Sequence, residues 1–563
     1  VPSEISFMNS LYACACLSDL YEGHRIHTWI IELGLESNVQ VGSSLVDMYS
    51  KCRSIIEARE VWEKMGPSDV VSWNSMISGY VNGNGIVNPN VNNNDSVSAG
   101  ANSIVNGSIN TNVGNSHEHR GGEEALSLFA QMQRENVEPD QITYVSVLKA
   151  CAIQRGLVEG KHVHHHITCN GMKPNVILGN ALLDMYIKCG DIEDAYEVFD
   201  GLSNRNVVSW TSMISGYYKV EKGEAALELY KQMQVMMVKP NEVTILNVIS
   251  TCASMGALRY GKYVHAQAIE EGLDWYEPIS NSLLCMYARC GCVIDANKFF
   301  KKISRPNVIA WTTMIYAYVQ ANLAQKACSL FEQMIQEGIK PDDVTYVSII
   351  KACTSLSSLD FGLWIHEKII RHGYEANMFL GSALIDMYSK CGSLDDAEIS
   401  FCRMSNHRAI ISWNAMISAY AQNGFCKYAL HLFWQMKQVI VSPNSITLVS
   451  VLSACSYGGM LYESIYHFIS MYLDHKIRPE LEHYNNMIDL LGRIGTLDLA
   501  EIFIRNMPYQ PTTISWMIFL SACKYQLDFE RATEATCFAL ELDSNNLAPS
   551  VVLTSIYSAT GKG

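Results

Sequence analysis

The sequence is poor in proline and in charge, and it has no long apolar run. Only 14 of its 563 residues are proline, and 17% are charged. No stretch of 18 or more apolar residues occurs, which excludes a transmembrane helix of ordinary length. Cationic side chains are the minority, with 41 Lys and Arg against 56 Asp and Glu. The resulting net charge of −15 argues against nucleic-acid binding, because nucleic-acid binders usually carry a basic surface patch.

The 18 cysteines do not form the framework of a disulfide-rich domain. They recur in two columns of the repeat described below, namely Cys52, Cys189, Cys290 and Cys391, and Cys14, Cys151, Cys252, Cys353 and Cys455. Regular columns of this kind indicate small buried side chains in a reducing compartment. No Cys-x-x-Cys occurs, and the Cys-x-Cys pairs Cys14/Cys16 and Cys290/Cys292 lack a second ligand pair. We therefore expect no metal and no other cofactor.

A unit of 101 residues, 207–307, recurs along the chain. Trp210 and Trp311 are 101 positions apart, Trp311 and Trp413 are 102 apart, and Trp413 and Trp516 are 103 apart. The unit divides into pieces of 35, 35 and 31 residues. A repeat of this period predicts a solenoid, because each piece can bury its apolar face only against its neighbours.

Each piece has the pattern of one helical hairpin. In 180–188, Ala181, Leu182, Met185 and Tyr186 form one apolar stripe, and Gly190 then stops the helix before a second one at 192–202. The twentieth position of each hairpin is small, and we expect this column to mark where the two helices of a hairpin cross. Its members are Ala58, Ala125, Ala195, Ala226, Ala296, Ala327, Ala397, Ala429 and Ala500, and in the third kind of hairpin Gly23, Gly160, Gly261, Gly362 and Ser464.

These motifs resemble the plant pentatricopeptide repeat family, in the subclass that rotates P, L and S motifs. The resemblance covers nearly the whole chain and implies an all-α fold, a right-handed superhelical solenoid of helix-turn-helix repeats. The motifs are L 4–38, S 39–69, P 70–140, L 141–175, S 176–206, P 207–241, L 242–276, S 277–307, P 308–342, L 343–377, S 378–409, P 410–444, L 445–480 and S 481–512. Residues 513–547 resemble the family's E-type extension, and 548–563 resemble a next motif cut short.

The domain organisation follows from this register. Residues 1–83 hold an L motif, an S motif and the start of a P motif, and residues 121–512 continue the array. Between them, 84–120 is an insertion rich in Asn, Ser and Gly, placed in the turn of the P motif. It cannot bury enough apolar surface to offset its ordering entropy, so we expect it to be disordered. Residues 513–563 form the truncated E-type extension.

The resemblance also implies that single-stranded RNA lies along the first helices, one base per repeat. In the family, the fifth and the last residue of a motif read the base. A terminal Asp only accepts hydrogen bonds and favours G or U, whereas a terminal Asn can donate to A or C. A short fifth residue leaves room for a purine, and Asn reaches a pyrimidine. An apolar second residue would wedge between bases, and the P motifs place Val71, Val208, Ile309 and Ile411 there.

This rule gives one base for each matching pair. The pairs are Ser43 with Asp69 (G), Asn74 with Asp140 (U), Asn180 with Asn206 (C), Thr211 with Asn241 (A), Asn281 with Asn307 (C), Thr312 with Asp342 (G) and Asn414 with Asn444 (C). Ser382 with Ala409 and Asn485 with Thr512 depart from the rule, so their bases stay open. The fifth residues of L motifs are apolar, and these motifs should read weakly. From the second motif the expected RNA is 5′-G-U-N-C-A-N-C-G-N-N-C-N-N-3′.

Basic residues recur at the thirteenth position of every S motif. They are Lys51, Lys188, Arg289, Lys390 and Arg493. They either contact phosphates or favour the C-terminus of the first helix, and the two interpretations are compatible.

The resemblance implies a sequence-specific RNA-binding adaptor in an organelle, most simply a site-recognition factor for C-to-U editing. The mitochondrion is slightly preferred over the chloroplast, and any targeting peptide would lie outside this chain. The family's deaminase motif is absent, so we expect a binding protein whose deaminase comes from a partner held by the C-terminal region. The alternatives are an α-solenoid scaffold that binds only protein, and an editing enzyme whose deaminase domain is missing here. No membrane or small-molecule partner is expected.

Overall fold

The computed structural model describes residues 3–35, 38–65, 69–82, 115–404, 409–543 and 546–559. Within these ranges every regular element is an α-helix, and 31 helices follow one another. The prediction of an all-α helical-repeat fold is therefore confirmed. Among these helices, none combines the length and the apolar character needed to cross a membrane.

The chain forms two compact units, Val1–Met286 and Tyr287–Gly563, and the boundary lies within α15 (Glu277–Arg289). Unit 1 contains α1 (Glu4–Leu17), α2 (Leu20–Glu32), α3 (Val39–Lys51), α4 (Ile55–Lys64), α5 (Val70–Asn82), α6 (Asn115–Arg134), α7 (Gln141–Gln154), α8 (Leu157–Cys169), α9 (Val176–Cys189), α10 (Ile192–Gly201), α11 (Val207–Lys219), α12 (Gly223–Val235), α13 (Glu242–Met255) and α14 (Leu258–Glu270).

Unit 2 contains α16 (Val293–Phe300), α17 (Val308–Gln320), α18 (Ala324–Gln336), α19 (Asp343–Leu356), α20 (Leu359–Arg371), α21 (Met378–Lys390), α22 (Leu394–Arg403), α23 (Ile410–Gln422), α24 (Cys426–Gln438), α25 (Ser445–Gly458), α26 (Leu461–Leu473), α27 (Leu481–Arg493), α28 (Leu497–Asn506), α29 (Thr513–Gln526), α30 (Phe529–Leu542) and α31 (Ala548–Ala559).

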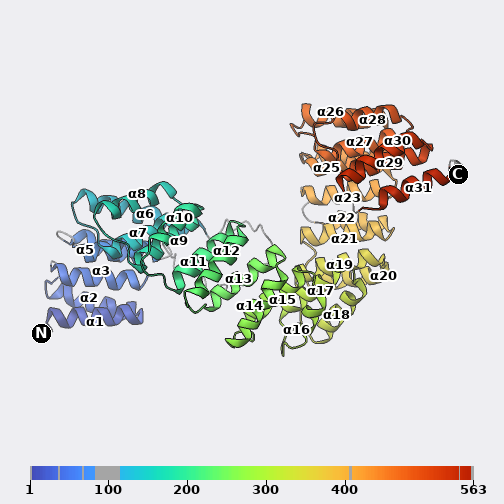
Figure 1. The fold of residues 1–563 in the computed structure, drawn as a ribbon. Coiled ribbons are helices and arrows are strands. Elements are labelled where there is room, and N and C mark those ends of the chain that lie inside the picture. The colour runs from blue at the N-terminus through green and yellow to red at the C-terminus, as the bar shows by residue number, and fades with distance from the viewer. Residues whose placement is uncertain are drawn as a thin grey trace. The chain divides into compact units, whose positions relative to one another are not determined.

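The helices alternate between two layers within each unit. Odd-numbered helices are the first helices of the hairpins, and each begins at the residue where a motif begins in the sequence, such as Val207 for α11. A first helix contacts its own second helix and the first helix of the next hairpin, as α7 does with α8 and α9. Figure 1 shows these successive hairpins in both units. The first helices thus form a continuous row inside each unit.

The recurring tryptophan joins consecutive hairpins. Trp210 packs edge-on against Phe199 at 4.9 Å between ring centroids, and Trp311 packs in the same way on Phe300 at 5.0 Å. Both tryptophans are at most 2% exposed. The spacing of the tryptophans therefore reflects a recurring aromatic contact between the second helix of an S motif and the first helix of the next P motif.

The glycine column corrects one prediction. A Cβ placed on Gly160 of α8 would overlap the thioether of Met185, which belongs to α9 of the next hairpin. The same relationship joins Gly23 with Met48, Gly261 with Met286 and Gly362 with Met387. We expected this column to mark the crossing within a hairpin, but these glycines mark the contact between hairpins. Sequence alone could not decide this, because both contacts require a small residue.

The insertion is shorter than predicted at its C-terminal end. Residues 115–120, which we assigned to it, are the first residues of α6. The imidazole Nδ1 of His119 lies 3.2 Å from Oε1 of Gln154 in α7, and the Gln154 amide donates to the His119 carbonyl. This contact ties the start of α6 to its neighbour. The predicted disorder of 84–114 lies outside the described residues.

The cysteine columns lie within the helix packing, as do His164 and His366, which are both the twenty-fourth residue of an L motif. The second cysteine column, Cys14, Cys151, Cys252, Cys353 and Cys455, is buried, and the first, Cys52, Cys189, Cys290 and Cys391, is half-buried. His164 and His366 each place Nδ1 next to a tyrosine hydroxyl, 2.9 Å from Tyr186 and 2.7 Å from Tyr388. Burial lowers the pKa of both imidazoles, so they are neutral packing partners near pH 7.

Candidate nucleic-acid interface

The fold brings the fifth and the last residue of a motif together. Hydrogen bonds join these two residues in five motifs. They are Ser43 with Asp69 (3.0 Å), Asn74 with Asp140 (2.9 Å), Asn180 with Asn206 (3.3 Å), Thr312 with Asp342 (3.5 Å) and Asn414 with Asn444 (3.2 Å). The fifth residue lies in the first helix of a hairpin, and the last residue follows the second helix. Their pairing therefore depends on the register of the repeat.

The last residue is also the N-cap of the following helix. Oδ1 of Asn206 accepts the backbone N–H of Ser209 at 3.0 Å at the start of α11. Oδ1 of Asp342 accepts the N–H of Thr345 at 2.8 Å at the start of α19. The same bond through Oδ1 is made by five further last residues, namely Asp69, Asp140, Asn241, Asn307 and Asn444. Helix capping therefore explains why these positions are Asp or Asn.

Capping also determines which atom a ligand can meet. Once Oδ1 is bound to the backbone, Asp presents Oδ2, which can only accept, and Asn presents Nδ2, which can only donate. The backbone N–H also fixes the amide orientation, since only the oxygen of Asn can accept it. The cap thus converts the choice between Asp and Asn into a choice between an acceptor and a donor at the surface.

The carboxylate of Asp140 illustrates the charge state of this acceptor. Burial alone would raise its pKa, but hydrogen bonds from the Thr143 backbone and from Asn74 hold the pKa of the Asp140 carboxyl below its ordinary value. Asp140 is therefore a charged acceptor at neutral pH.

A third polar residue, which the sequence analysis missed, completes the arrangement. Oγ1 of Thr447 donates to Oδ1 of Asn414 at 2.6 Å and lies 2.9 Å from Oδ1 of Asn444. The third residue of each L motif that follows a P motif is such a threonine, namely Thr143, Thr244, Thr345 and Thr447, and all are fully buried. This column of identical residues was the available signal. It holds the fifth side chain of the preceding motif in place.

The two members of a pair differ in their exposure to solvent, a difference that the sequence did not predict. Four of the five bonded fifth residues are nearly covered, with Ser43 at 4%, Asn74 and Thr312 at 7% and Asn414 at 8% exposure, whereas Asn180 is half-buried. The last residues are more open, since Asp140 is half-buried and Asn206 is exposed. A ligand can therefore reach the last residue directly, whereas it meets only the edge of the fifth.

One further pair is bonded through a third residue, and another falls at the boundary of the two units. Thr211 reaches Asn241 through Thr244, whose hydroxyl lies 2.6 Å from that of Thr211 and donates to Oδ1 of Asn241 at 2.8 Å. Asn281 and Asn307 are divided between the two units.

The two pairs that depart from the rule also lack the arrangement. Ser382 donates to the Met378 carbonyl at 2.9 Å, and Ala409 caps α23 without a side-chain bond. Thr512 caps α29 with its single hydroxyl, so no second polar atom remains to meet a ligand. Its partner Asn485 has a buried Oδ1 with no hydrogen-bond partner among the described residues.

In two L motifs the side chain of the last residue is hydrogen-bonded to the first residue of the same motif. Asn175 caps α9 through Oδ1, and its Nδ2 donates to Oε1 of Gln141, the first residue of the motif, at 2.8 Å. Asn377 donates likewise to Asp343 at 3.4 Å. The fifth residues are apolar throughout the L motifs, at Met8, Val145, Leu246, Val347 and Val449. These contacts give a physical reason for the expectation that L motifs read weakly.

An exposed apolar stripe accompanies the polar pairs. Val71, Val208 and Ile411 are 57, 47 and 39% exposed, and Ile309 is half-buried. The stripe extends further than predicted, because second residues of other motifs are also exposed, namely Ile142, Ile177, Val243, Phe379, Ile446 and Ile514. A row of exposed apolar side chains stays in contact with water unless an apolar partner covers it, and such a row is typical of a binding surface.

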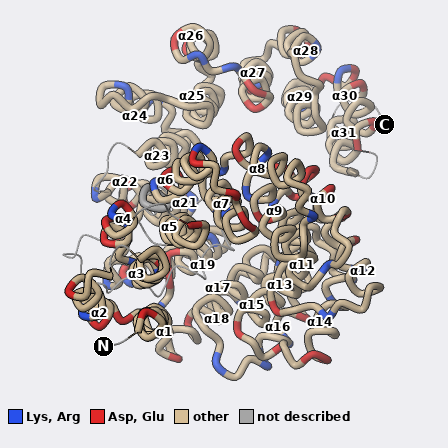
Figure 2. The backbone as a smooth tube through the Cα atoms, turned by 90° about the vertical axis from the view of Figure 1, so that its left-hand side faces the viewer, with Lys and Arg blue, Asp and Glu red and all other residues tan. Residues whose placement is uncertain are grey.

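The basic column is paired with acids. Lys51 Nζ lies 2.7 Å from Asp47, and Lys188 Nζ lies 2.8 Å from Asp184, one turn earlier on the same helix. Lys390 with Asp386 and Arg493 with Asp489 repeat this arrangement, and Arg289 lies in α15. Exposed pairs of this type contribute only about 0.3–0.5 kcal/mol, so a phosphate could compete for the cation. Figure 2 shows charges of both signs scattered along the helices.

No cluster of three or more His, Cys, Asp or Glu side chains suited to a metal ion occurs in the part of the chain that the structure describes.

Family models match much of the chain. The "PPR repeat family" model matches residues 205–254 and 306–355, the "PPR repeat" model matches 43–66, 71–84, 180–207, 279–307, 382–408 and 411–439, and the "pentatricopeptide repeat domain" model matches 127–189. These matches fall on the hairpins that carry the polar pairs.

Relatives and solved structures agree with these matches. The chloroplastic pentatricopeptide repeat-containing protein At1g11290 of Arabidopsis thaliana is 34% identical over 99% of this chain, which spans 64% of that protein. The mitochondrial protein At2g03380 of the same plant is 33% identical over 99% of this chain and 76% of its own length. The fold is similar to that of the maize pentatricopeptide repeat protein PPR10, with a TM-score of 0.60 at 17% identity over 99% of this chain and 87% of that one. This chain belongs to the pentatricopeptide repeat family.

Proposed function

We propose that this protein binds single-stranded RNA and reads one base with each P and S motif that carries a capped Asp or Asn. The observation that supports this most strongly is the cap itself. It holds the last residue so that one acceptor or one donor remains at the surface beside an exposed apolar second residue. An array of such sites is suited to unpaired bases, which offer a flat face for stacking and a polar edge for hydrogen bonds.

The base preferences follow from the presented atoms. Oδ2 of Asp342 would accept the ring N–H of G, and Nδ2 of Asn241 would donate to the ring nitrogen of A. The small hydroxyl residues Thr312 and Thr211 leave space for these purines. With the pyrimidine assignments for the Asn pairs, the proposed sequence is 5′-G-U-N-C-A-N-C-G-N-N-C-N-N-3′.

The finer role we propose is site recognition for C-to-U editing in an organelle. The rotation of 35-, 35- and 31-residue motifs and the E-like segment 513–563 support the editing subclass by resemblance. A solved structure of maize PPR10 is a complex with an 18-nt psaJ RNA element, which is consistent with RNA binding by this fold. Relatives with chloroplastic and mitochondrial names support an organelle, and we favour the mitochondrion. The deaminase would be supplied by a partner bound through 513–563.

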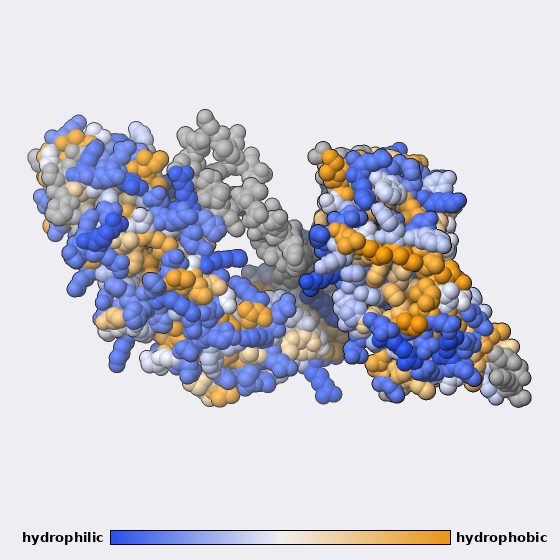
Figure 3. Space-filling view, turned by 90° about the horizontal axis from the view of Figure 1, so that it is seen from above, coloured by the Kyte–Doolittle hydropathy of each residue, from blue (hydrophilic) through white to orange (hydrophobic). Residues whose placement is uncertain are grey.

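One observation favours a second candidate, a scaffold that binds protein. The outer face of α26 carries Ile465, Ile469 and Leu473 in one line, with exposures of 42, 52 and 60%. Figure 3 looks onto the end of unit 2 that holds α26 and α28, and it shows a hydrophobic band there. A protein partner could cover this band whether or not RNA binds to the first helices.

Binding of the 13-base RNA, compared with a scrambled strand of equal composition, tests the first candidate. We expect at least tenfold tighter binding of the proposed sequence. In Thr312→Asn, which leaves Asp342 unchanged, the preference at the eighth base should move from G toward U. Equal affinity for the two strands would refute base reading and leave the protein scaffold as the better account. The comparison should be made at one salt concentration, because phosphate contacts depend on salt.

A further inference from the structure

A cavity of about 240 Å³ lies within unit 2, where the second helix of an L motif meets the S motif that follows it. It is lined by residues of α20, α21 and α22 and of the segments that come directly after α20 and α22. The apolar part of its wall consists of Ile369, Ile370, Leu380, Leu384 and Met404. Its volume lies below the roughly 300–1,000 Å³ of sites for drug-sized ligands, and it suits a molecule as small as an amino acid.

The cavity coincides with a small polar side chain at a position that is apolar in the other S motifs. The twenty-third residue of motif 378–409 is Ser400, which lines the cavity. In the other four S motifs the same position holds Val61, Val198, Phe299 and Phe503. The cavity is therefore tied to a feature of this motif and does not follow from the repeat fold alone.

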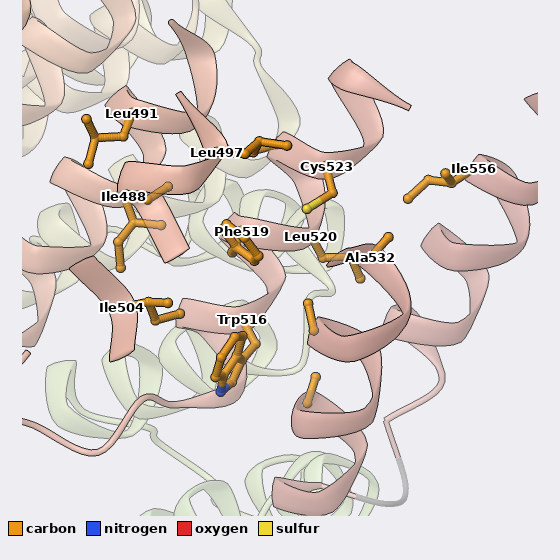
Figure 4. Close-up of a cluster of buried hydrophobic side chains, with 14 of the residues drawn as sticks. Ile488, Leu491, Leu497, Ile504, Trp516, Phe519, Leu520, Cys523, Ala532 and Ile556 are labelled. Atoms are coloured by element: carbon orange, nitrogen blue, oxygen red, sulfur yellow. The ribbon is translucent and has the colours of Figure 1, made fainter. Parts of the chain in front are cut away.

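The last S motif shows what fills the equivalent space. The ring of Phe503 lies 5.9 Å from that of Phe468 and 5.5 Å from that of Tyr484, measured between centroids. Tyr484 and Phe503 pack against the buried cluster in Figure 4, which includes Ile488 and Ile504 of the same motif. The residues at the positions of the three rings in motif 378–409 all line the cavity, namely Ser400, His366 and Gly381. The cavity thus takes the place of aromatic rings.

The hydroxyl of Ser400 marks the buried end of the cavity. Ser400 is 5% exposed, and its Oγ has no hydrogen-bond partner among the described residues. Buried hydroxyls nearly always have such a partner, because an unpaired one costs about 1–3 kcal/mol of desolvation. A ligand with a polar atom at this point would supply the missing hydrogen bond.

Two opposite charges mark the exposed end. Glu375 and Arg403 both line the cavity and are exposed, and neither forms a salt bridge within the part of the chain that the structure describes. Both act on the imidazole of His366, which also lines the cavity. Burial lowers the pKa of His366, and the charge of Arg403 adds to this effect, whereas Asp396 and Glu375 oppose it. An anionic and a cationic group of one ligand can therefore be bound side by side.

These features together match one class of molecule. A guanidinium binds a carboxylate, a carboxylate binds an ammonium group, and an apolar wall suits a ring. We propose that this cavity binds a free phenolic amino acid, of which tyrosine is the simplest, with its α-carboxylate at Arg403, its ammonium group at Glu375 and its phenol hydroxyl at Ser400. This inference goes beyond the proposed function and does not depend on RNA binding.

The test measures binding to the full chain by isothermal titration calorimetry with tyrosine and three probes that each lack one of its groups. Phenylalanine lacks the phenol hydroxyl, 3-(4-hydroxyphenyl)propanoate lacks the ammonium group, and tyramine lacks the carboxylate. We expect phenylalanine to bind at least about tenfold more weakly than tyrosine, because it leaves the buried hydroxyl unpaired. The other two should bind about three- to fivefold more weakly, because exposed ion pairs contribute little. Equal affinity for tyrosine and phenylalanine, or no binding of any probe at about 1 mM, would overturn the inference.

Substitutions assign each contact. Ser400→Ala keeps the space but removes the hydroxyl, and it should abolish the preference for tyrosine over phenylalanine. Glu375→Gln should abolish the preference over 3-(4-hydroxyphenyl)propanoate, and Arg403→Gln should abolish the preference over tyramine. Glu367→Gln is the matched control and should change none of them, because Glu367 pairs with Arg371 on α20 and does not line the cavity. An unchanged preference for tyrosine over phenylalanine in Ser400→Ala would contradict the assignment.

Hydrogen exchange locates the site. Tyrosine at ten times its dissociation constant should slow exchange in α20, α21 and α22 about tenfold, because it binds only the folded form. Ser400→Val fills the cavity without unfolding the chain, and it should weaken tyrosine binding at least about tenfold and remove this protection. Protection by tyrosine that appears only in other helices, or that persists in Ser400→Val, would place the site elsewhere and overturn the inference.

Discussion

Oδ1 of Asp342 accepts the backbone N–H of Thr345 at 2.8 Å, so one side chain both starts α19 and stands where a base would be read. The two roles use different oxygen atoms. Stability therefore constrains Oδ1, and in the function we propose specificity depends on Oδ2. Substitutions can separate the roles, because some residues retain the cap and lose the second atom.

The cap role predicts a graded loss of stability at position 342. Asp342→Ala should cost about 1 kcal/mol, because the Thr345 N–H loses its acceptor, whereas Asp342→Asn and Asp342→Ser should cost less than about 0.5 kcal/mol. Hydrogen exchange at the start of α19 is the suitable measurement, since a repeat array can open locally. Equal protection in the Ala and Ser variants would show that the cap contributes little.

The buried threonine column predicts a larger effect. Thr447→Val keeps the shape but leaves Oδ1 of Asn414 without the donor that lies 2.6 Å away. We expect destabilisation of about 1–3 kcal/mol around α25, as for other buried acceptors without a partner. The double variant Thr447→Val with Asn414→Leu should recover part of the loss, because neither group then needs a hydrogen bond. A double variant that is less stable than both single variants would contradict this explanation.

The contact between Gly160 and Met185 predicts that substitutions at the two positions partly compensate each other. Gly160→Ala places a Cβ against the Met185 thioether and should destabilise the α8–α9 contact by about 1–3 kcal/mol. Met185→Ala alone should also destabilise, because it leaves a cavity. The two changes together should be less harmful than their sum, which a double-mutant cycle on urea unfolding measures. Additive effects would mean that the two residues do not share the contact.

A cavity in unit 2 predicts a stabilising substitution. Ser400 is 5% exposed, its hydroxyl has no partner among the described residues, and it lines a cavity of about 240 Å³ with Leu384 and Met404. The corresponding residues of two other S motifs are Val61 and Val198. Ser400→Val should raise the free energy of unfolding by about 0.5–2 kcal/mol. The matched change Val198→Ser should lower it, and a loss of stability in Ser400→Val would show that the hydroxyl has a role.

The histidine of α26 predicts acid sensitivity. Burial, assisted by the charge of Lys437, lowers the pKa of His467 from 6.5 to about 4, while Glu463 opposes the shift and His475 adds to it. The folded state binds the proton more weakly than the unfolded state. Stability is therefore complete above about pH 6.5 and falls by about 3 kcal/mol as the pH drops toward 4.

The control for this prediction is His467→Asn, which removes the titrating group. Local unfolding of α26, followed by hydrogen exchange between pH 4 and 7, should lose most of its pH dependence in the variant. The same slope in both proteins would assign the acid sensitivity to other groups.

The register of the helices could be predicted from sequence because it depends on local signals. The start of α11 at Val207 follows from the capping residue before it and from the spacing of the tryptophans. The pairing of Asn414 with Asn444 followed from the resemblance alone. The part played by Thr447 did not, because a threonine at a helix start is explained locally by a capping box and gives no sign of a partner 33 residues away.

Two further features needed coordinates. The glycine at position 160 could have served either helix contact, and only the position of Met185 decides between them. The near-complete burial of Ser43 and Asn414 could not be predicted, because a polar residue at a helix start is usually exposed.

The most direct test of the central claim is the base preference at the eighth position of the RNA, measured by equilibrium binding of the full chain to four strands that differ only there. The wild type should prefer G, Asp342→Asn should prefer A, and Asp342→Ser, which keeps the cap without a second polar atom, should show no preference. If all three proteins rank the four strands alike, Asp342 acts as a helix cap alone, and the account of base reading is wrong.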